Sequence, residues 1–396
     1  MKDEVGMTAP GISTFSFPTT IDFGVGAVER IPQRIRGLGV SRPLLITDAG
    51  LIETEAFMRV RRALDGSRIR FAVFSGVQPN PTDANVEEGA IAFKYDGCDV
   101  VLAVGGGSAI DVGKAVRLRS THAEPLIEFD DARDGASRIR SQMPPMIAVP
   151  TTAGTGSEVG RSAVITVGQV GRKVVIFSPH LIPNVAVCDP QLTVGLPPHL
   201  TAATGMDALS HNLEALAAQG YHPICDAIAR QGIALVGENL RQAVTDGKNL
   251  DARTNMLMAS MMGAIAFQKG LGAAHSLAHP LSTELGMHHG LANALVLPHV
   301  VHFNRDAATP AYVVAARCFG LREADAGGQA AVDALIAALK RLNADVGLPA
   351  SLSAAKVPRE ALPALADKAF EDACHRLNPR GCTRDDLLHL YEAAYV

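Results

Sequence analysis

The 396-residue sequence contains no tryptophan, no closely spaced cysteine pair and no long hydrophobic run. Because its six cysteines are scattered, we expect neither a disulfide framework nor a metal site built from sulfur ligands. No segment approaches the roughly 18 consecutive apolar residues of a membrane span. The first ten residues carry mixed charges and lack the apolar core of a signal peptide. These absences predict a cytoplasmic protein with reduced thiols.

The sequence also has little excess charge of either sign. Lysine and arginine number 36 and aspartate and glutamate 40, which gives a net charge of −4. Such a balance indicates no nucleic-acid partner. Hydrophobic residues make up 47% and charged residues 19% of the chain, which excludes wholesale disorder. At about 150 residues per domain, the length predicts two or three domains.

Residues 1–190 alternate short apolar runs with helical patterns. Runs of this length between helices favour a parallel, Rossmann-like sheet covered on both faces. Two further β-rich segments, 161–167 and 173–177, predict an added hairpin. The predicted strands are 43–47, 70–74, 99–104 and 146–149, and the predicted helices between them are 51–66 and 83–97.

After about residue 190 the chain becomes rich in alanine, leucine and methionine, and β-branched runs become scarce. Three prolines within 189–198 mark the boundary. We therefore predict an α/β dinucleotide-binding domain over 1–190 and a helical, metal-binding domain over 191–396, with the active site in the cleft between them. The predicted helices are 199–218, 223–246, 250–270 and 327–346.

Two glycine-rich elements follow predicted strands. GGGSAIDVGKAV (105–116) opens a helix whose free N–H groups suit a phosphate, although it is neither the standard G-x-G-x-x-G fingerprint nor a P-loop. PTTAGTGSEVGR (150–161) offers hydroxyl groups between glycines. Asp48 ends another predicted strand, where a carboxylate could bind an adenosine ribose and disfavour a 2′-phosphate. Both glycine-rich elements could also be ordinary turns, and Asp48 a helix cap.

Histidine is concentrated in one part of the sequence. Even spacing of the 13 histidines would place about one in a window of 28 residues, but six fall within 275–302. We assign no role to three of these six. They are His288, His299 and His302.

Two pairs of polar residues have helical spacing. Asp207 and His211 lie four residues apart, as do His275 and His279, so each pair shares one helix face. His289 follows after a loop. One carboxylate and three of these imidazoles would suit a divalent transition-metal ion. Each pair alone is a weak indication, because such spacings arise by chance and single histidines often serve in the core.

The sequence resembles the iron-containing, or group III, alcohol dehydrogenases. The resemblance runs from Phe23 to Arg380, and its motifs are GGGSAID (105–111), PTTAGTGSEV (150–159), GMDALSH (205–211) and GAAHSLAHPL with HHGLANALVLPH (within 272–299). It implies a dehydroquinate synthase-like fold. The metal ligands it implies are Asp207, His211, His275 and His289, with His279 lining the catalytic cleft. The cofactor contacts it implies are Asp48, Asn80, Gly106, Gly107, Ser108, Asp111, Thr151, Thr152 and Lys173.

Within that family, AFQKGLG (266–272) and CHRLNPR (374–380) are similar to 4-hydroxybutyrate dehydrogenases, which implies a small ω-hydroxy acid as substrate. The resemblance implies NAD, rather than NADP, and one divalent ion, Fe(II) ahead of Zn. The ion would act as a Lewis acid while hydride passes between a primary alcohol and NAD. His279 would relay the proton, although a purely structural histidine is the alternative. A homodimer is expected.

Three other interpretations stay open. The same chemistry could act on a simple alcohol, a diol or a phosphonate-bearing aldehyde. A metal-dependent lyase resembling dehydroquinate synthase would need a cationic pocket, whereas the histidine stretch is flanked mostly by alanine, leucine and glycine. A non-catalytic binding module is the third. For a substrate carboxylate, Arg161 and Arg380 are candidates by charge alone.

Overall fold

The computed structural model describes residues 17, 20–326 and 328–396, which form two compact units. An α/β unit comprises Pro18–Leu196 together with Gly247–Leu257. A helical unit comprises Pro197–Asp246 and Met258–Val396. Within the described residues, no helix combines the length and the apolar character needed to cross a membrane.

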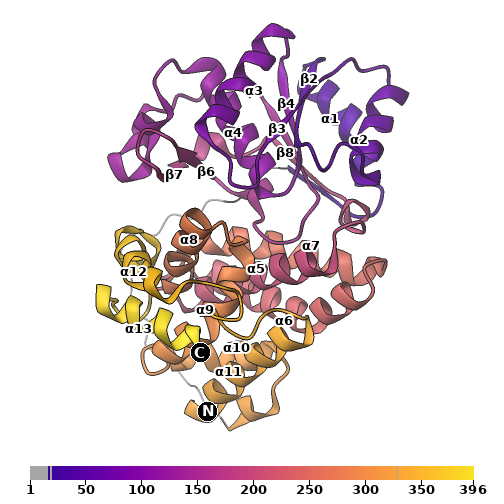
Figure 1. The fold of residues 1–396 in the computed structure, drawn as a ribbon. Coiled ribbons are helices and arrows are strands. Elements are labelled where there is room, and N and C mark those ends of the chain that lie inside the picture. The colour runs from indigo at the N-terminus through magenta and orange to yellow at the C-terminus, as the bar shows by residue number, and fades with distance from the viewer. Residues whose placement is uncertain (1–16, 18–19, 327) are drawn as a thin grey trace. The chain divides into compact units, whose positions relative to one another are not determined.

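The α/β unit is built on a six-stranded, all-parallel sheet with the order β1-β8-β5-β4-β2-β3. Figure 1 labels four of these strands, β2, β3, β4 and β8. The chain runs outward from β2 to β3, returns to place β4 on the other side of β2, and then continues through β5 to β8. Strand order therefore reverses between β2 and β4, where open α/β sheets bind ligands. The strands are β1 (Thr20–Phe23), β2 (Pro43–Asp48), β3 (Ala72–Val77), β4 (Val100–Gly105), β5 (Met146–Pro150) and β8 (Val185–Cys188).

Helices cover both faces of this sheet. Successive side chains of a strand point to opposite faces, so each strand contributes to two cores. In β4, Val101 and Ala103 pack with α3 (Asp83–Tyr95) and α4 (Gly107–Thr121). The intervening Leu102 and Val104 belong to a second core, with α1 (Ile31–Gly37) and α2 (Glu55–Gly66). The apolar runs that predicted β2, β4 and β5 are thus strands buried on both sides, whereas the edge strand β3 is only partly buried.

The predicted hairpin is present as the antiparallel pair β6 (Ser162–Val167) and β7 (Arg172–Phe177). Its inward side chains Ile165 and Ile176 pack into the core beneath α4. Strands β1 and β8 were not predicted. Each has only four residues, too few to show a clear period.

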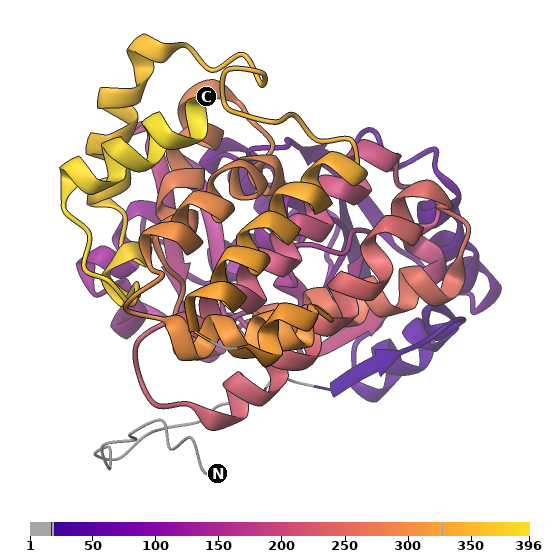
Figure 2. The ribbon, with the colours of Figure 1, turned by 90° about the horizontal axis from the view of Figure 1, so that it is seen from below.

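The helical unit is organised around α5 (Pro198–Ala217), which packs against α6 (Pro223–Thr245) and α9 (His289–Phe303). Every residue of α5 from Thr201 to Leu216 is buried, as expected for a central helix without a solvent-facing stripe. Figure 2 shows the later helices of this unit in orange and yellow. The other helices are α8 (Ala273–Leu285), α10 (Thr309–Cys318), α11 (Gly328–Asp345), α12 (Leu362–Glu371) and α13 (Arg384–Tyr395). Helix α7 (Leu250–Ala266) belongs to the α/β unit up to Leu257 and to the helical unit from Met258. The predicted fold class, a Rossmann-like parallel sheet followed by a helical region, is confirmed.

Candidate metal centre and nucleotide-binding elements

Helix α5 presents three buried titratable side chains from one face. Asp207, His211 and Glu214 follow one another at intervals of four and three residues, and all three are buried. Burying a carboxylate is costly unless it is paired or binds a cation. This row of buried polar groups therefore requires partners from other helices.

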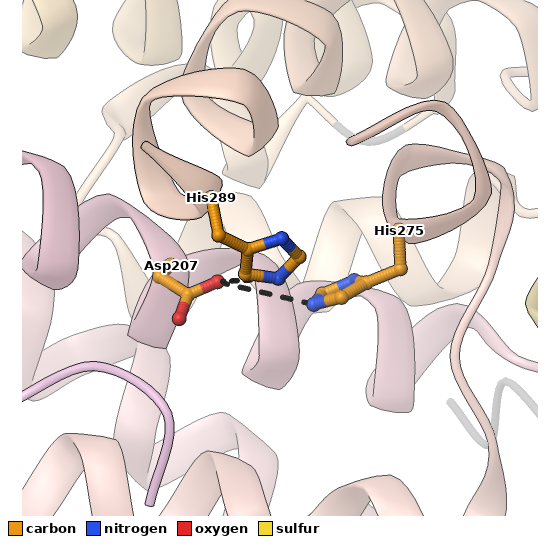
Figure 3. A group of neighbouring side chains, drawn as sticks. All are labelled: Asp207, His275 and His289. Atoms are coloured by element: carbon orange, nitrogen blue, oxygen red, sulfur yellow. Dashed lines mark ion pairs between the residues drawn. The ribbon is translucent and has the colours of Figure 1, made fainter. Parts of the chain in front are cut away.

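His275 from α8 and His289 from the start of α9 supply partners for Asp207. The Oδ1 atom of Asp207 lies 3.9 Å from Nε2 of His275 and 3.5 Å from Nε2 of His289 (Figure 3). The possible ligand atoms of these three residues all lie within 4.8 Å of one another. Gly290 permits this approach, because a Cβ atom there would lie 2.1 Å from the carbonyl oxygen of Ala203 on α5.

His211 lies beside this group rather than within it. Its ring stacks on that of His275, with 4.6 Å between centroids and 22° between planes, and it also contacts Phe267 at 5.1 Å. The structure therefore brings three of the four predicted ligands together and places the fourth against one of them.

The donor set fits a divalent ion. Two imidazole nitrogens and a carboxylate oxygen are ligands that transition metals prefer. The buried amide of Asn293 points its Nδ2 atom at the same group, 2.8 Å from Asp207 Oδ1 and 3.2 Å from His289 Nε2. Its Oδ1 atom is buried without a hydrogen-bond partner. A buried carboxylate oxygen and two imidazole nitrogens that converge on one another fit a site that binds a cation.

Glu214, which the sequence analysis missed, holds the other side of His275. One carboxylate oxygen pairs with Nδ1 of His275, and the other accepts the backbone N–H of Ala274 at 2.7 Å. Burial opposes the imidazolium, but the carboxylates of Glu214 and Asp207 outweigh it and raise the pKa of His275. No local signal identifies Glu214, since its partner is 61 residues away in the sequence.

His279 also has a carboxylate partner that the sequence analysis missed. Its Nδ1 atom lies 2.7 Å from Oδ2 of Asp372, whose other oxygen accepts hydrogen bonds from the Ser276 hydroxyl and the Cys374 backbone N–H. Although burial works against the charged form, His279 and these hydrogen bonds hold the pKa of Asp372 well below its usual range. The His279 ring stacks on that of His289, 5.3 Å between centroids.

In the α/β unit, Asp48 lies beside the first glycine-rich turn. A Cβ atom on Gly105 would be 3.9 Å from Oδ2 of Asp48, so the ends of β2 and β4 bring the carboxylate and the turn together. This is the point at which strand order reverses. The Oδ1 atom of Asp48 accepts the backbone N–H of Leu51 at 3.0 Å, so the carboxylate also fixes the turn after β2.

The two glycine-rich elements pack directly on each other. Cβ atoms on Gly106 and Gly107 would lie 3.3 Å from Thr152 and 2.6 Å from Thr155. The hydroxyl of Ser108 donates to the carbonyl of Pro79 at 2.7 Å, which brings the segment containing Asn80 to the start of α4. The backbone N–H of Thr151 donates to the carbonyl of Gly105 at 3.0 Å.

Asp111 and Lys173, also predicted as cofactor contacts, are parts of a charged network beneath the hairpin. The carboxylate of Asp111 accepts the Ser157 hydroxyl at 2.6 Å and the Val164 backbone N–H at 3.0 Å. Burial lowers the pKa of Lys173, and the negative charge of Asp111 partly offsets this shift. The fully buried Lys114 donates to Ser157 at 2.7 Å, and burial lowers its pKa to about 8. Lys114 was not predicted as a site residue.

Sequence profiles agree with this arrangement. The profile described as iron-containing alcohol dehydrogenase matches residues 18–190, and that of the C-terminal part of the same family matches residues 201–395. The chain belongs to the iron-containing alcohol dehydrogenase family. It is therefore an oxidoreductase of a metal-containing family, as predicted.

Relatives in this family are similar over nearly their whole length. A 4-hydroxybutyrate dehydrogenase of Cupriavidus necator is 40% identical over 383 residues, 94% of this chain and 97% of that protein. A 1,3-propanediol dehydrogenase of Klebsiella pneumoniae is 38% identical over 381 residues, 96% of this chain and 97% of that protein. A crystal structure of a 1,3-propanediol oxidoreductase superposes with a TM-score of 0.91 at 37% identity, covering 97% of this chain and 100% of the other. The predicted similarity to 4-hydroxybutyrate dehydrogenases is confirmed.

Both arginines considered for a substrate carboxylate have other partners in this member of the family. The Arg161 guanidinium lies 5.3 Å from the ring centroid of Phe177, in the α/β unit. That of Arg380 stacks on Phe303 at 3.8 Å and lies 3.6 Å from Asp386. Their positive charges are thus engaged by other groups.

Proposed function

We propose that this protein is a metal-dependent, NAD-linked alcohol dehydrogenase that transfers hydride between a small primary alcohol and NAD. The observation that carries the proposal is the convergence of Asp207, His275 and His289, with His211 stacked alongside. These four residues would hold the ion in the helical unit, and the α/β unit would bind the dinucleotide. The names of the relatives, among them an NAD-dependent methanol dehydrogenase of Bacillus methanolicus, support the same reaction class.

The bound ion would supply a Lewis acid for the substrate oxygen, and the nicotinamide would exchange the hydride. We propose Fe(II) as the native ion, with Zn as the second candidate, because imidazole and carboxylate ligands suit both. The candidate ligands Asp207, His275 and His289 include no thiolate, so their chemistry does not select Zn over Fe(II).

The protein's own groups would perform the remaining tasks. Asp48 would accept hydrogen bonds from the adenosine ribose and repel a 2′-phosphate. The start of α4, at Gly106, Gly107 and Ser108, would turn backbone N–H groups toward the phosphates. Asn80, Asp111, Thr151, Thr152 and Lys173 are the further cofactor contacts that we propose.

His279 would carry the alcohol proton to solvent. Because Asp372 accepts from its Nδ1 atom, Nε2 is the nitrogen left to exchange a proton. An imidazole is suited to this role near neutral pH. Asp372 would keep the ring in one orientation during the exchange.

For the substrate we propose a small ω-hydroxy acid such as 4-hydroxybutyrate, on the similarity to the Cupriavidus enzyme. An uncharged diol is the second candidate, because Arg161 and Arg380 are both engaged by aromatic rings. Sequence identity does not separate these candidates, because the chain is 40% identical to the 4-hydroxybutyrate dehydrogenase and 38% identical to the 1,3-propanediol dehydrogenase. A homodimer in the cytoplasm stays a prediction.

A substrate panel tests this function. NADH formation should be measured with 4-hydroxybutyrate, 1,3-propanediol and ethanol, together with the metal content of the same sample. We expect turnover by the metal-loaded protein and none by its Asp207→Ala variant. If the metal-loaded protein forms no NADH with any of the three, the proposed substrate class is wrong. If the Asp207→Ala variant keeps both metal and rate, the ligand assignment is wrong.

A further inference from the structure

Glu214 occupies a special place behind the candidate ligands. It lies on α5, one turn beyond His211 and two turns beyond Asp207, and its side chain is only 5% exposed. Both its oxygens face hydrogen-bond donors on α8, the backbone N–H of Ala274 at 2.7 Å and Nδ1 of His275. A buried charge in this position is compensated by two charge-assisted hydrogen bonds.

Gly272 leaves the space that the Glu214 carboxylate occupies. A Cβ atom on Gly272 would lie 2.8 Å from Oε1 of Glu214 and 2.9 Å from Oδ1 of Asn378. Asn378 itself accepts the backbone N–H of Ala273 at 3.2 Å, so two side-chain oxygens cap the first turn of α8. The negative charge of Glu214 at the N-terminus of α8 also interacts favourably with the helix dipole.

The contact with Nδ1 determines which nitrogen of His275 carries the proton. A carboxylate can only accept, so Nδ1 must be protonated. The neutral ring then presents an unprotonated Nε2, the atom that lies 3.9 Å from Asp207 Oδ1. Only an unprotonated nitrogen can ligate a metal.

We propose that Glu214 is a positioning residue that fixes the Nδ1–H tautomer of His275 and thereby prepares its Nε2 atom for metal binding. The inference rests on the proposed function, because it assumes that His275 is a ligand. It assigns a role to a residue that touches neither substrate nor ion, acting through the histidine and through the cap of α8.

The Glu214→Gln variant tests the tautomer rather than the packing. Glutamine has nearly the same shape but only one accepting oxygen. If that oxygen accepts from Ala274, the amide N–H group faces Nδ1 and forces the proton onto Nε2. If that oxygen accepts from His275 instead, the glutamine amide N–H group faces the backbone N–H of Ala274, and the two donors repel each other. Either outcome disfavours the arrangement that binds metal.

The readout is metal affinity, measured for Zn²⁺ and Fe²⁺ by competition with a chromogenic chelator. We expect Glu214→Gln to bind each ion about 10- to 100-fold more weakly, the range found when partners of ligands are removed. Glu284→Gln is the matched control. Glu284 lies on α8, the helix that carries His275, and pairs with Lys368, so its variant should keep wild-type affinity.

A second measurement does not depend on the variant's folding. Long-range ¹H–¹⁵N spectra of the metal-free wild type, labelled at histidine, should show His275 protonated at Nδ1. Finding Nδ1 unprotonated overturns the proposal, as does an unchanged metal affinity in folded Glu214→Gln. Failure of the proposed function looks different, because Asp207→Ala would then bind metal as well as the wild type.

Discussion

Nδ1 of His279 lies 2.7 Å from Oδ2 of Asp372, although 93 residues separate the two in the sequence. The carboxylate is held from its other side by the Ser276 hydroxyl at 2.8 Å and the backbone N–H of Cys374 at 2.8 Å. His279 therefore has a fixed orientation, whereas a histidine on an exposed helix face would be free to rotate.

Replacing Asp372 by asparagine should slow turnover without removing the metal. The asparagine cannot supply the negative charge that stabilises a protonated His279, so kcat should fall about tenfold or more, given the usual contribution of a positioned acid or base. Steady-state kinetics and metal analysis check this. Ser276→Ala is the control, because it removes one bond to Asp372 and leaves the bond to His279. The fall in kcat of Ser276→Ala should be smaller than that of Asp372→Asn. An unchanged kcat in Asp372→Asn would contradict the proposed support of His279 by Asp372.

Asp48 should determine the choice between the two dinucleotides. Its carboxylate lies beside the Gly105 turn and would repel a 2′-phosphate, so Asp48→Gly should raise the ratio of kcat/KM with NADP to that with NAD at least about tenfold. Asp48→Asn keeps the shape and removes only the charge. It should shift the ratio in the same direction by less. An unchanged ratio in both variants would rule out ribose recognition by Asp48.

Gly107 should not tolerate a methyl group. A Cβ atom there would lie 2.6 Å from Cγ2 and 2.9 Å from Oγ1 of Thr155, so Gly107→Ala must push the two glycine-rich elements apart. We expect a raised KM for NAD and a loss of about 1–3 kcal/mol in the free energy of unfolding. Gly37→Ala is the control, since nothing lies within 4 Å of its Cβ position. Denaturant titration and NAD kinetics of both variants provide the comparison.

Much of this arrangement was predictable because its signals are local. The buried strands of the sheet are continuous apolar runs, and Asp207 with His211 and His275 with His279 show helical spacing within a few residues. The residue four positions after His289 is the amide Asn293, which is not a characteristic metal ligand, so the family resemblance assigned His289 to the ligand set.

The partners of these residues were not predictable, for a physical reason. Glu214 meets His275 across 61 residues, and Asn293 meets Asp207 across 86. Tertiary packing alone creates such contacts, and neither helical nor strand periodicity records them. His211 illustrates the same limit, because its spacing from Asp207 predicts a shared helix face but not the stacking on His275.

Acid should weaken the α/β unit through Asp22, which lies in β1 and whose carboxylate accepts two hydrogen bonds from Arg34, both at 2.6 Å. The hydrogen bonds and charge of Arg34 lower the pKa of Asp22 below 3.8, against the effect of burial. A lowered carboxyl pKa stabilises the folded state above the unfolded value, and that contribution is lost as the pH falls through the folded one. Asp22→Asn should therefore lose about 2 kcal/mol at pH 7.

The difference between wild type and Asp22→Asn should shrink as the pH falls below 3.8, because protonation removes from the wild type the charge that the variant already lacks. Urea unfolding at pH 7, 4 and 2.5 measures it. Asp65→Asn is the control: Asp65 pairs with Arg61 at 3.5 Å with both side chains more than half exposed, so its replacement should cost almost nothing. A difference for Asp22→Asn that stays constant over this range would mean that Arg34 stabilises the fold by packing rather than by charge.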